Sequence, residues 1–281
     1  MSTHAQRRLV LRSLFAALVV GVIVFPFAWI VISSFRSPDG FLSLDLANAL
    51  PHSIDLTSYS MALGRADLLR WMTTSLFVAS ATAVLSLAVA APMAFALARL
   101  RFRGRRTTSG MLVLHYAVPS VTIAVPMFVL LVALGQYDSL AALVVVHSTL
   151  TIPFCAWVLR DFYESLPVEI EEACFVDGAG LGGVLLRVVL PLSVPALLAA
   201  GAYAFILSWN DFLFAFILIN SPDNYTAPVG IHAFFTGRNI DQSLWAQLMA
   251  ASTIVSLPSV ILFAVFQRYL VSGFLSGSVR G

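Results

Sequence analysis

Long apolar stretches alternate along the chain with short segments that carry nearly all of its charge. A helix that crosses a bilayer core of about 30 Å needs roughly 20 consecutive apolar residues. Six stretches without a charged residue reach that length, and we predict one membrane-spanning helix in each. The predicted spans are Ser13–Phe35, Trp71–Ala98, Thr107–Tyr137, Ser139–Leu159, Val188–Asn210 and Gln242–Gln267. The pattern therefore predicts an all-α, multi-pass membrane protein with a single transmembrane domain over residues 1–281.

Two shorter elements are expected between the spans. The apolar run Phe212–Pro222 is too short to cross a membrane alone, so it either extends the fifth helix or forms a re-entrant segment. In the first long loop, the pattern after Pro51 indicates a short amphipathic helix near Thr57–Leu69. The loop between the third and fourth spans holds little beyond Asp138, which makes those two helices a tight antiparallel pair.

The arginine residues set the orientation of the predicted bundle, because loops rich in Lys and Arg stay on the cytoplasmic side. All sixteen basic residues are Arg. With the N-terminus inside, twelve of them fall in cytoplasmic segments and four in outer segments. We therefore expect both termini in the cytoplasm, with a cytoplasmic loop 160–187, an outer loop 220–241 and a cytoplasmic tail 268–281.

Composition excludes several classes of protein. Of the 281 residues, 59% are hydrophobic and only 11% are charged, against about 25% charged in soluble domains. The net charge of +2 is too small to indicate nucleic-acid binding. The five His are scattered and no metal-ligand spacing occurs, so we expect neither a metal site nor a catalytic centre. Cys155 and Cys174 lie in different segments and are expected to be free thiols.

The cytoplasmic loop 160–187 is acidic, with six acidic residues against two Arg. Pro167 lies near a helix start, and the acids after it suit the positive end of the helix dipole. Apolar residues near helical spacing give this helix one apolar and one acidic face. Gly178 and Gly180 then allow a sharp turn into a second helical stretch, Leu181–Leu190. On composition alone, a solvated connector is an equally good interpretation.

The same loop resembles the signature of ATP-binding-cassette importer permeases: Glu-Ala-Ala, three residues, Gly, nine residues, an aliphatic residue, one residue and Leu-Pro. Here Glu172-Ala173-Cys174 is followed at matching spacings by Gly178, Val188 and Leu190-Pro191. Cys174 stands where the family usually has Ala, and both residues are small and apolar. Further segments similar to the carbohydrate branch of that family are Pro92–Gly104, Trp209–Phe212 and Gln267–Gly281.

The resemblance implies roles for particular residues. In that family the Glu-Ala-Ala loop is a coupling helix that docks in a groove of the cytoplasmic ATPase, and an acidic helix suits a basic groove. The residues expected to couple to the ATPase are Glu171, Glu172, Ala173, Cys174, Asp177, Gly178 and Ala179. The family's C-terminal tail inserts between ATPase subunits, and its counterparts are Gly277, Val279, Arg280 and Gly281. By itself the tail from Ser272 has no amphipathic face and would be disordered.

The candidates for a substrate path are Tyr116, Trp209, Asn210 and Asp211. An ionisable residue at membrane depth usually faces protein or water, so Asp211 either bonds a neighbouring helix or lines the path. The Trp209 indole suits an interfacial belt as well as a sugar face. His147, in the middle of the fourth span, is expected to be a hydrogen-bonded core residue.

The resemblance implies one permease subunit of a carbohydrate importer in the bacterial plasma membrane. Its partners would be a second permease in a heterodimer, two ATPase subunits that hold ATP and Mg, and an extracytoplasmic solute-binding protein reached by the outer loop 220–241. The sugar path would lie at the interface of the two permeases, since six helices enclose too little space. Which sugar is carried is left open.

This chain would be no enzyme and would bind no cofactor. The string Gly178-x-Gly180-x-x-Gly183 lacks the preceding strand and the later acid of a nucleotide site. The alternative function is an ion-coupled secondary transporter of a small polar solute. That function needs paired intramembrane charges, for which Asp211 is the one candidate in the sequence.

Overall fold

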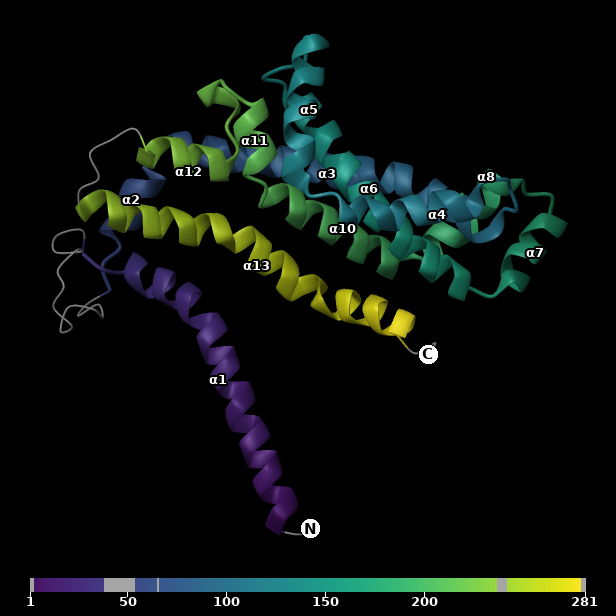
Figure 1. Cartoon of the computed structure of the whole chain (residues 1–281), viewed down its shortest axis with the longest axis horizontal. Coiled ribbons are helices and arrows are strands. Elements are labelled where there is room, and N and C mark those ends of the chain that lie inside the picture. The colour runs from purple at the N-terminus through teal and green to yellow at the C-terminus, as the bar shows by residue number, and fades with distance from the viewer. Residues whose placement is uncertain (1–2, 38–53, 65, 237–241, 279–281) are drawn as a thin grey trace. The chain divides into compact units, whose positions relative to one another are not determined.

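The computed structural model describes residues 3–37, 54–64, 66–236 and 242–278. All the regular secondary structure assigned to these residues is helical (Figure 1). The all-α prediction is therefore confirmed for the described residues. The chain divides into two compact units. Unit 1 comprises Met1–Leu69 and Ile231–Leu257, and unit 2 comprises Arg70–Gly230 and Pro258–Gly281.

The helices differ widely in length, and the longest of them supply the apolar spans. In chain order they are α1 (Thr3–Ser34), α2 (Thr57–Leu63), α3 (Ala66–Arg99), α4 (Arg105–Leu114), α5 (Ser120–Ala133), α6 (Leu140–Ser165), α7 (Val168–Val176), α8 (Leu181–Val184), α9 (Leu190–Leu192), α10 (Val194–Trp209), α11 (Leu213–Leu218), α12 (Ala227–Thr236) and α13 (Gln242–Ser278). A π-helical turn, Leu185–Val189, joins α8 to α9.

Among the described residues, four helices are long and apolar enough to cross a membrane by themselves: Leu11–Ser34, Asp67–Arg99, Leu140–Ser165 and Ser243–Gln267. They coincide with the first, second, fourth and sixth predicted spans. A fifth is added if the pair Leu181–Leu192 and Val194–Trp209, bent by 82°, forms one span. The bend falls at Ser193, inside the predicted fifth span, so that span is not one straight helix. Together these helices make the chain a multi-pass membrane protein.

The third predicted span, Thr107–Tyr137, is not a continuous helix either. α4 ends at Leu114 and α5 begins only at Ser120. Pro119 explains the break, because a proline disfavours the helical conformation in the residue before it. Val118 is accordingly extended, with φ −91° and ψ 117°. A count of charge-free residues does not detect such a break.

Unit 1 contains α1 and α2. The most apolar part of α1 buries none of its residues within the chain, and a helix that is apolar on all sides needs an apolar environment. At the end of α1, Ser34 Oγ lies 2.6 Å from Tyr59 Oη of α2. The helix expected at Thr57–Leu69 is shorter than predicted, because α2 ends at Leu63 and α3 begins at Ala66.

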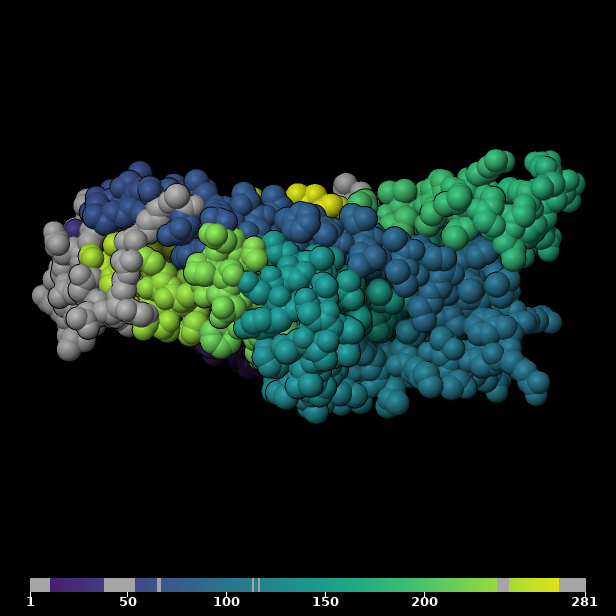
Figure 2. Space-filling view, turned by 90° about the horizontal axis from the view of Figure 1, so that it is seen from above, coloured from purple at the N-terminus to yellow at the C-terminus, as the bar shows by residue number. Residues whose placement is uncertain are grey.

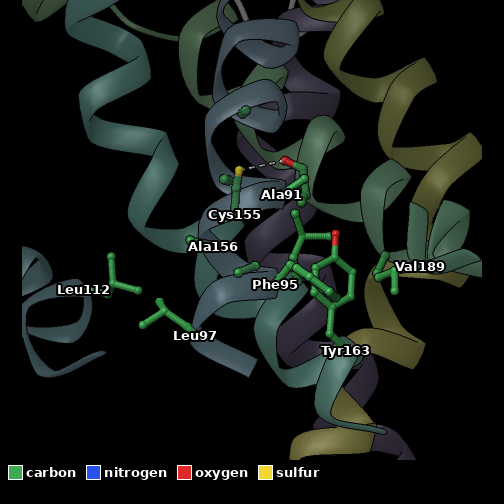
Figure 3. Close-up of a cluster of buried hydrophobic side chains, with 14 of the residues drawn as sticks. Ala91, Phe95, Leu97, Leu112, Cys155, Ala156, Tyr163 and Val189 are labelled. Carbon is green, nitrogen blue, oxygen red and sulfur yellow. Dashed lines mark hydrogen bonds between the residues drawn. The ribbon is translucent and has the colours of Figure 1, made fainter. Parts of the chain in front are cut away.

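The core of unit 2 lies where α3, α6 and α10 pack together (Figure 3). Small buried side chains such as Ala91, Ala156 and Ala200 allow the helix backbones to approach closely. Cys155 Sγ of α6 donates to the carbonyl of Ala200 in α10 at 3.4 Å. Cys155 and Cys174 are both free thiols, as predicted.

A second group of buried apolar residues surrounds α11 and includes Val78, Leu143, Phe214 and Leu218. It packs α11 against α3, α5 and α6. Since α10 ends at Trp209 and α11 begins at Leu213, the apolar run Phe212–Pro222 does not continue the fifth helix.

The C-terminal tail differs from the sequence prediction. α13 runs to Ser278, so the tail from Ser272 continues a helix instead of being disordered. Extending an existing helix needs no new nucleation, which explains why residues without an amphipathic face remain helical. The predicted tail residue Gly277 lies in the last turn, whereas Val279, Arg280 and Gly281 fall outside the described residues.

Candidate functional site

The predicted coupling loop folds as two short helices joined by a glycine turn. α7 begins directly after Pro167 and ends at Val176, and α8 begins at Leu181. Between them Gly178 has φ +82°, a left-handed conformation that favours glycine. Figure 2 shows this segment, in green, at the surface of unit 2.

The predicted coupling residues on this segment do not all face the same way. Glu172, Ala173, Asp177 and Gly178 are exposed, whereas Cys174 and Ala179 are half-buried against the core of unit 2 and Glu171 is buried. The expected division into one apolar and one acidic face is therefore incomplete, because acidic Glu171 lies inside and several apolar residues lie outside.

The outward side of α7 is mixed in character. Val176 is 88% exposed, Ile170 and Phe175 are each more than 40% exposed, and Glu172 is exposed as well. We call these four residues the docking surface. Exposed apolar groups bordered by charge on an element outside the spans are typical of protein–protein contacts.

Glu171 pairs with Arg99, the last residue of α3. Arg99 Nε donates to Glu171 Oε1 at 2.8 Å, and Arg99 Nη2 lies at the same distance from that oxygen. Arg99 Nη2 also donates to the carbonyls of Tyr163, at 2.7 Å, and Leu166, at 3.0 Å. One guanidinium therefore joins α3, the end of α6 and α7.

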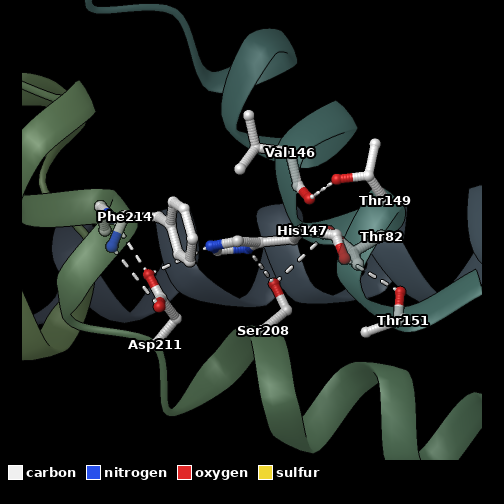
Figure 4. Close-up of polar contacts among 9 residues, drawn as sticks. Thr82, Val146, His147, Thr149, Thr151, Ser208, Asp211 and Phe214 are labelled. Atoms are coloured by element: carbon white, nitrogen blue, oxygen red, sulfur yellow. Dashed lines mark hydrogen bonds and ion pairs between the residues drawn. The ribbon is translucent and has the colours of Figure 1, made fainter. Parts of the chain in front are cut away.

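A chain of buried polar side chains crosses unit 2 between α3, α6 and α10. His147 is fully buried, as expected of a core histidine. Its Nδ1 lies 2.7 Å from Ser208 Oγ and its Nε2 lies 3.1 Å from Asp211 Oδ2 (Figure 4). Ser208 Oγ donates to Thr82 Oγ1 of α3 at 3.4 Å. Thr151 is also buried and lies one turn after His147 in α6.

Asp211 lies two residues before Leu213, the first residue of α11, and bonds the first turn of that helix. Its Oδ2 accepts the backbone N–H of Ala215 at 3.0 Å, and its Oδ1 lies 3.5 Å from the N–H of Phe214. This is the way a helix N-cap satisfies free N–H groups. Of the two roles that the sequence left open for Asp211, the bond to a neighbouring helix is present in this geometry, and the role in a path stays a prediction.

The other substrate-path candidates lie in different environments. Trp209 is buried, with its ring stacked on Phe205 at 5.8 Å between centroids. Asn210 is exposed, its amide donates to the carbonyl of Ile206, and its Oδ1 lies 3.4 Å from Ser259 Oγ. Tyr116 lies in the short turn after α4, and its side chain is outside the described residues.

On the predicted outer side, Asp138 organises the loop after α11. Its Oδ1 accepts the N–H groups of Asn220, at 2.9 Å, and Ser221, at 3.0 Å, and its Oδ2 accepts the Ser221 hydroxyl. Burial raises the pKa of Asp138, but the hydrogen bonds from Ser221, Asn220 and Asn224 outweigh it and hold that pKa below its ordinary value. Asp138 has φ 61°, which Asp tolerates better than most residues.

Sequence reasoning missed the pairs Arg99–Glu171 and His147–Asp211. Arg99 entered the analysis as a cytoplasmic charge, and His147 as a hydrogen-bonded core residue whose partner was not named. A signal was present, since a buried histidine and a carboxylate in neighbouring spans are each costly unless paired.

Comparison with known proteins identifies the family. Residues 86–275 match the sequence profile of the family described as "Binding-protein-dependent transport system inner membrane component". The chain belongs to this family. It is a permease subunit, so the secondary-transporter alternative is not favoured.

The relatives cover nearly the whole permease. The inner membrane ABC transporter permease protein YcjP of Escherichia coli is 33% identical over 94% of both chains. The trehalose/maltose transport system permease protein MalG of Thermococcus litoralis is 30% identical over 95% of both. A bacterial ABC transporter involved in import of the acidic polysaccharide alginate has the same fold, with TM-score 0.83 and 21% identity over 96% of this chain and 98% of that one.

Proposed function

We propose that this permease forms half of the translocation path of an ATP-driven sugar importer. Support for a sugar comes from relatives named for trehalose and maltose transport at 30% identity over almost the full length. The scarcity of charged residues in the spans agrees with an uncharged solute, since a charged one would need paired groups at membrane depth.

The proposed topology has six crossings with both termini in the cytoplasm of a bacterial cell. In it, α4 and α5 together make the third crossing. The bent pair of Leu181–Leu192 and α10 makes the fifth. The distribution of arginine, twelve against four, supports this orientation.

The proposed partners are a second, non-identical permease, two ATPase subunits and an extracytoplasmic solute-binding protein. ATP and Mg bind to the ATPase subunits, and this chain contributes neither a cofactor site nor a catalytic residue. The loop after α11, held by Asp138, and the rest of 220–241 face the binding protein. The end of α13, from Gly277, lies along the ATPase interface. Asn210 is the exposed candidate for the sugar path.

The docking surface of α7 is the observation that carries this proposal. Ile170, Phe175 and Val176 are exposed on a short helix outside the long spans. Docking would remove the apolar surface of these residues from water, which favours binding. Glu172 on the same helix supplies charge complementarity to a basic groove. When ATP closes the ATPase dimer, α7 moves with it and the permease pair opens outward.

The test is sugar uptake by proteoliposomes that contain the complete transporter. Uptake should require ATP and the binding protein, and the ATPase should co-purify with the permease. Glu172→Lys should abolish uptake while membrane insertion is unchanged. Uptake driven by an ion gradient without an ATPase would reject the proposal.

A further inference from the structure

The side chain of Arg99 holds three elements together at the base of the predicted coupling loop. It belongs to the C-terminal end of α3, contacts the last carbonyls of α6 and pairs with Glu171 of α7. Its side chain is 13% exposed and that of Glu171 5%. At this burial an ion pair is little screened by salt and its geometry is restrained.

The two neighbouring carboxylates of α7 are therefore not equivalent. Glu172 points outward onto the docking surface, where an ATPase subunit could reach it. Glu171 points inward and is held within the chain. A force applied to α7 from outside would reach α3 and α6 through the Glu171–Arg99 bonds, because Leu166 and Pro167 form an extended connection between α6 and α7.

We infer that Arg99 is a positioning residue for energy coupling: it transmits the movement of α7 to α3 and α6, and Glu171 is its anchor instead of an ATPase contact. This inference rests on the proposed function of α7. The guanidinium is suited to the task because its planar fork bonds a carboxylate and two carbonyls at once. A lysine ammonium at this site would keep the charge but not the planar geometry of these three hydrogen bonds.

The experiment compares Arg99→Lys and Glu171→Gln with the wild-type complex. The matched control is Arg160→Gln, which removes a cation whose hydrogen bond and ion pair are made with Glu164 of its own helix. Three quantities are measured in proteoliposomes: the amount of assembled complex, basal ATP hydrolysis, and the stimulation of hydrolysis by sugar-loaded binding protein.

Both variants should assemble and retain basal hydrolysis, while stimulation falls by about tenfold, within the range typical of coupling between sites. Arg160→Gln should behave like wild type. Glu171→Gln is the decisive variant if Arg99→Lys assembles poorly, because it leaves the bonds from Arg99 to α6 in place. Normal stimulation of an assembled Glu171→Gln complex, or failure of both variants to assemble, would overturn the inference.

These outcomes are distinguishable from failure of the proposed function. If the wild-type chain binds no ATPase, the function of α7 is rejected before any variant is compared. If the wild-type complex is stimulated and Glu172→Lys is not, but the Arg99 and Glu171 variants equal wild type, only the positioning role is rejected.

Discussion

His147 Nε2 of α6 lies 3.1 Å from Oδ2 of Asp211, which stands between α10 and α11. The same carboxylate accepts backbone N–H groups of α11. A histidine from one helix therefore fixes the start of another, and it does so with groups that are costly to bury unpaired.

We expect His147→Leu to lower the free energy of unfolding by about 1–3 kcal/mol, because it removes the buried hydrogen bonds that the imidazole makes with Asp211 and Ser208. Thermal unfolding of the purified permease in detergent measures the change. Thr149→Ala, on the exposed side of the same helix, is the control and should have little effect. Additive losses in the double variant His147→Leu/Asp211→Asn would contradict the pairing.

Much of this fold follows from local sequence. Charge-free length identifies α1, α3, α6 and α13, because a spanning helix must be long and apolar. The break before Pro119 has a local signal in the proline itself, which a count of charge-free residues ignores. The bend at Ser193 was not predicted, since it depends on backbone conformation within a stretch that remains apolar.

The candidate site was predictable only in part. Spacing located the helix of the predicted coupling segment and its glycine turn at Gly178, because both are local features. The partners of Glu171 and Asp211 lie 72 and 64 residues away in sequence. Such pairs depend on how the helices pack against one another, and a single sequence does not show that packing directly.

Tyr163 provides a test of the core of unit 2. Its side chain is fully buried, and its hydroxyl has no hydrogen-bond partner among the described residues (Figure 3). An unsatisfied buried hydroxyl costs free energy, so Tyr163→Phe should leave stability unchanged or raise it by about 1 kcal/mol. Thermal unfolding in detergent measures this, and a destabilised variant would show that the hydroxyl has a partner.

Gly230 lies against the indole of Trp71. A Cβ atom at this position would overlap the Trp71 ring, so one of the two must move. We expect Gly230→Ala to destabilise the permease by about 1–3 kcal/mol through overpacking. Gly182→Ala is a matched control, because nothing lies within 4 Å of its added Cβ. Equal unfolding temperatures for the two variants would contradict the close approach.

Asp138 makes the outer loop sensitive to acid. Its folded-state pKa is held below the ordinary value of 3.8, so its stabilising contribution is present above that value and is lost as pH falls through the folded pKa. Asp138→Asn tolerates the left-handed backbone but carries no charge. Between pH 6 and pH 3, wild type should lose more stability than this variant, as measured by unfolding temperature. Parallel losses would refute the assignment.

The docking surface is tested at Val176, whose side chain is 88% exposed and contributes little to the fold. Val176→Asp should therefore leave the unfolding temperature unchanged. It should weaken ATPase binding by at least about tenfold, or about 1.4 kcal/mol, because a charge replaces an apolar group that must leave water on docking. Ile54→Asp, at a residue that is 78% exposed and lies before α2, is the control and should bind ATPase normally. Full ATPase co-purification with Val176→Asp would place the docking surface elsewhere.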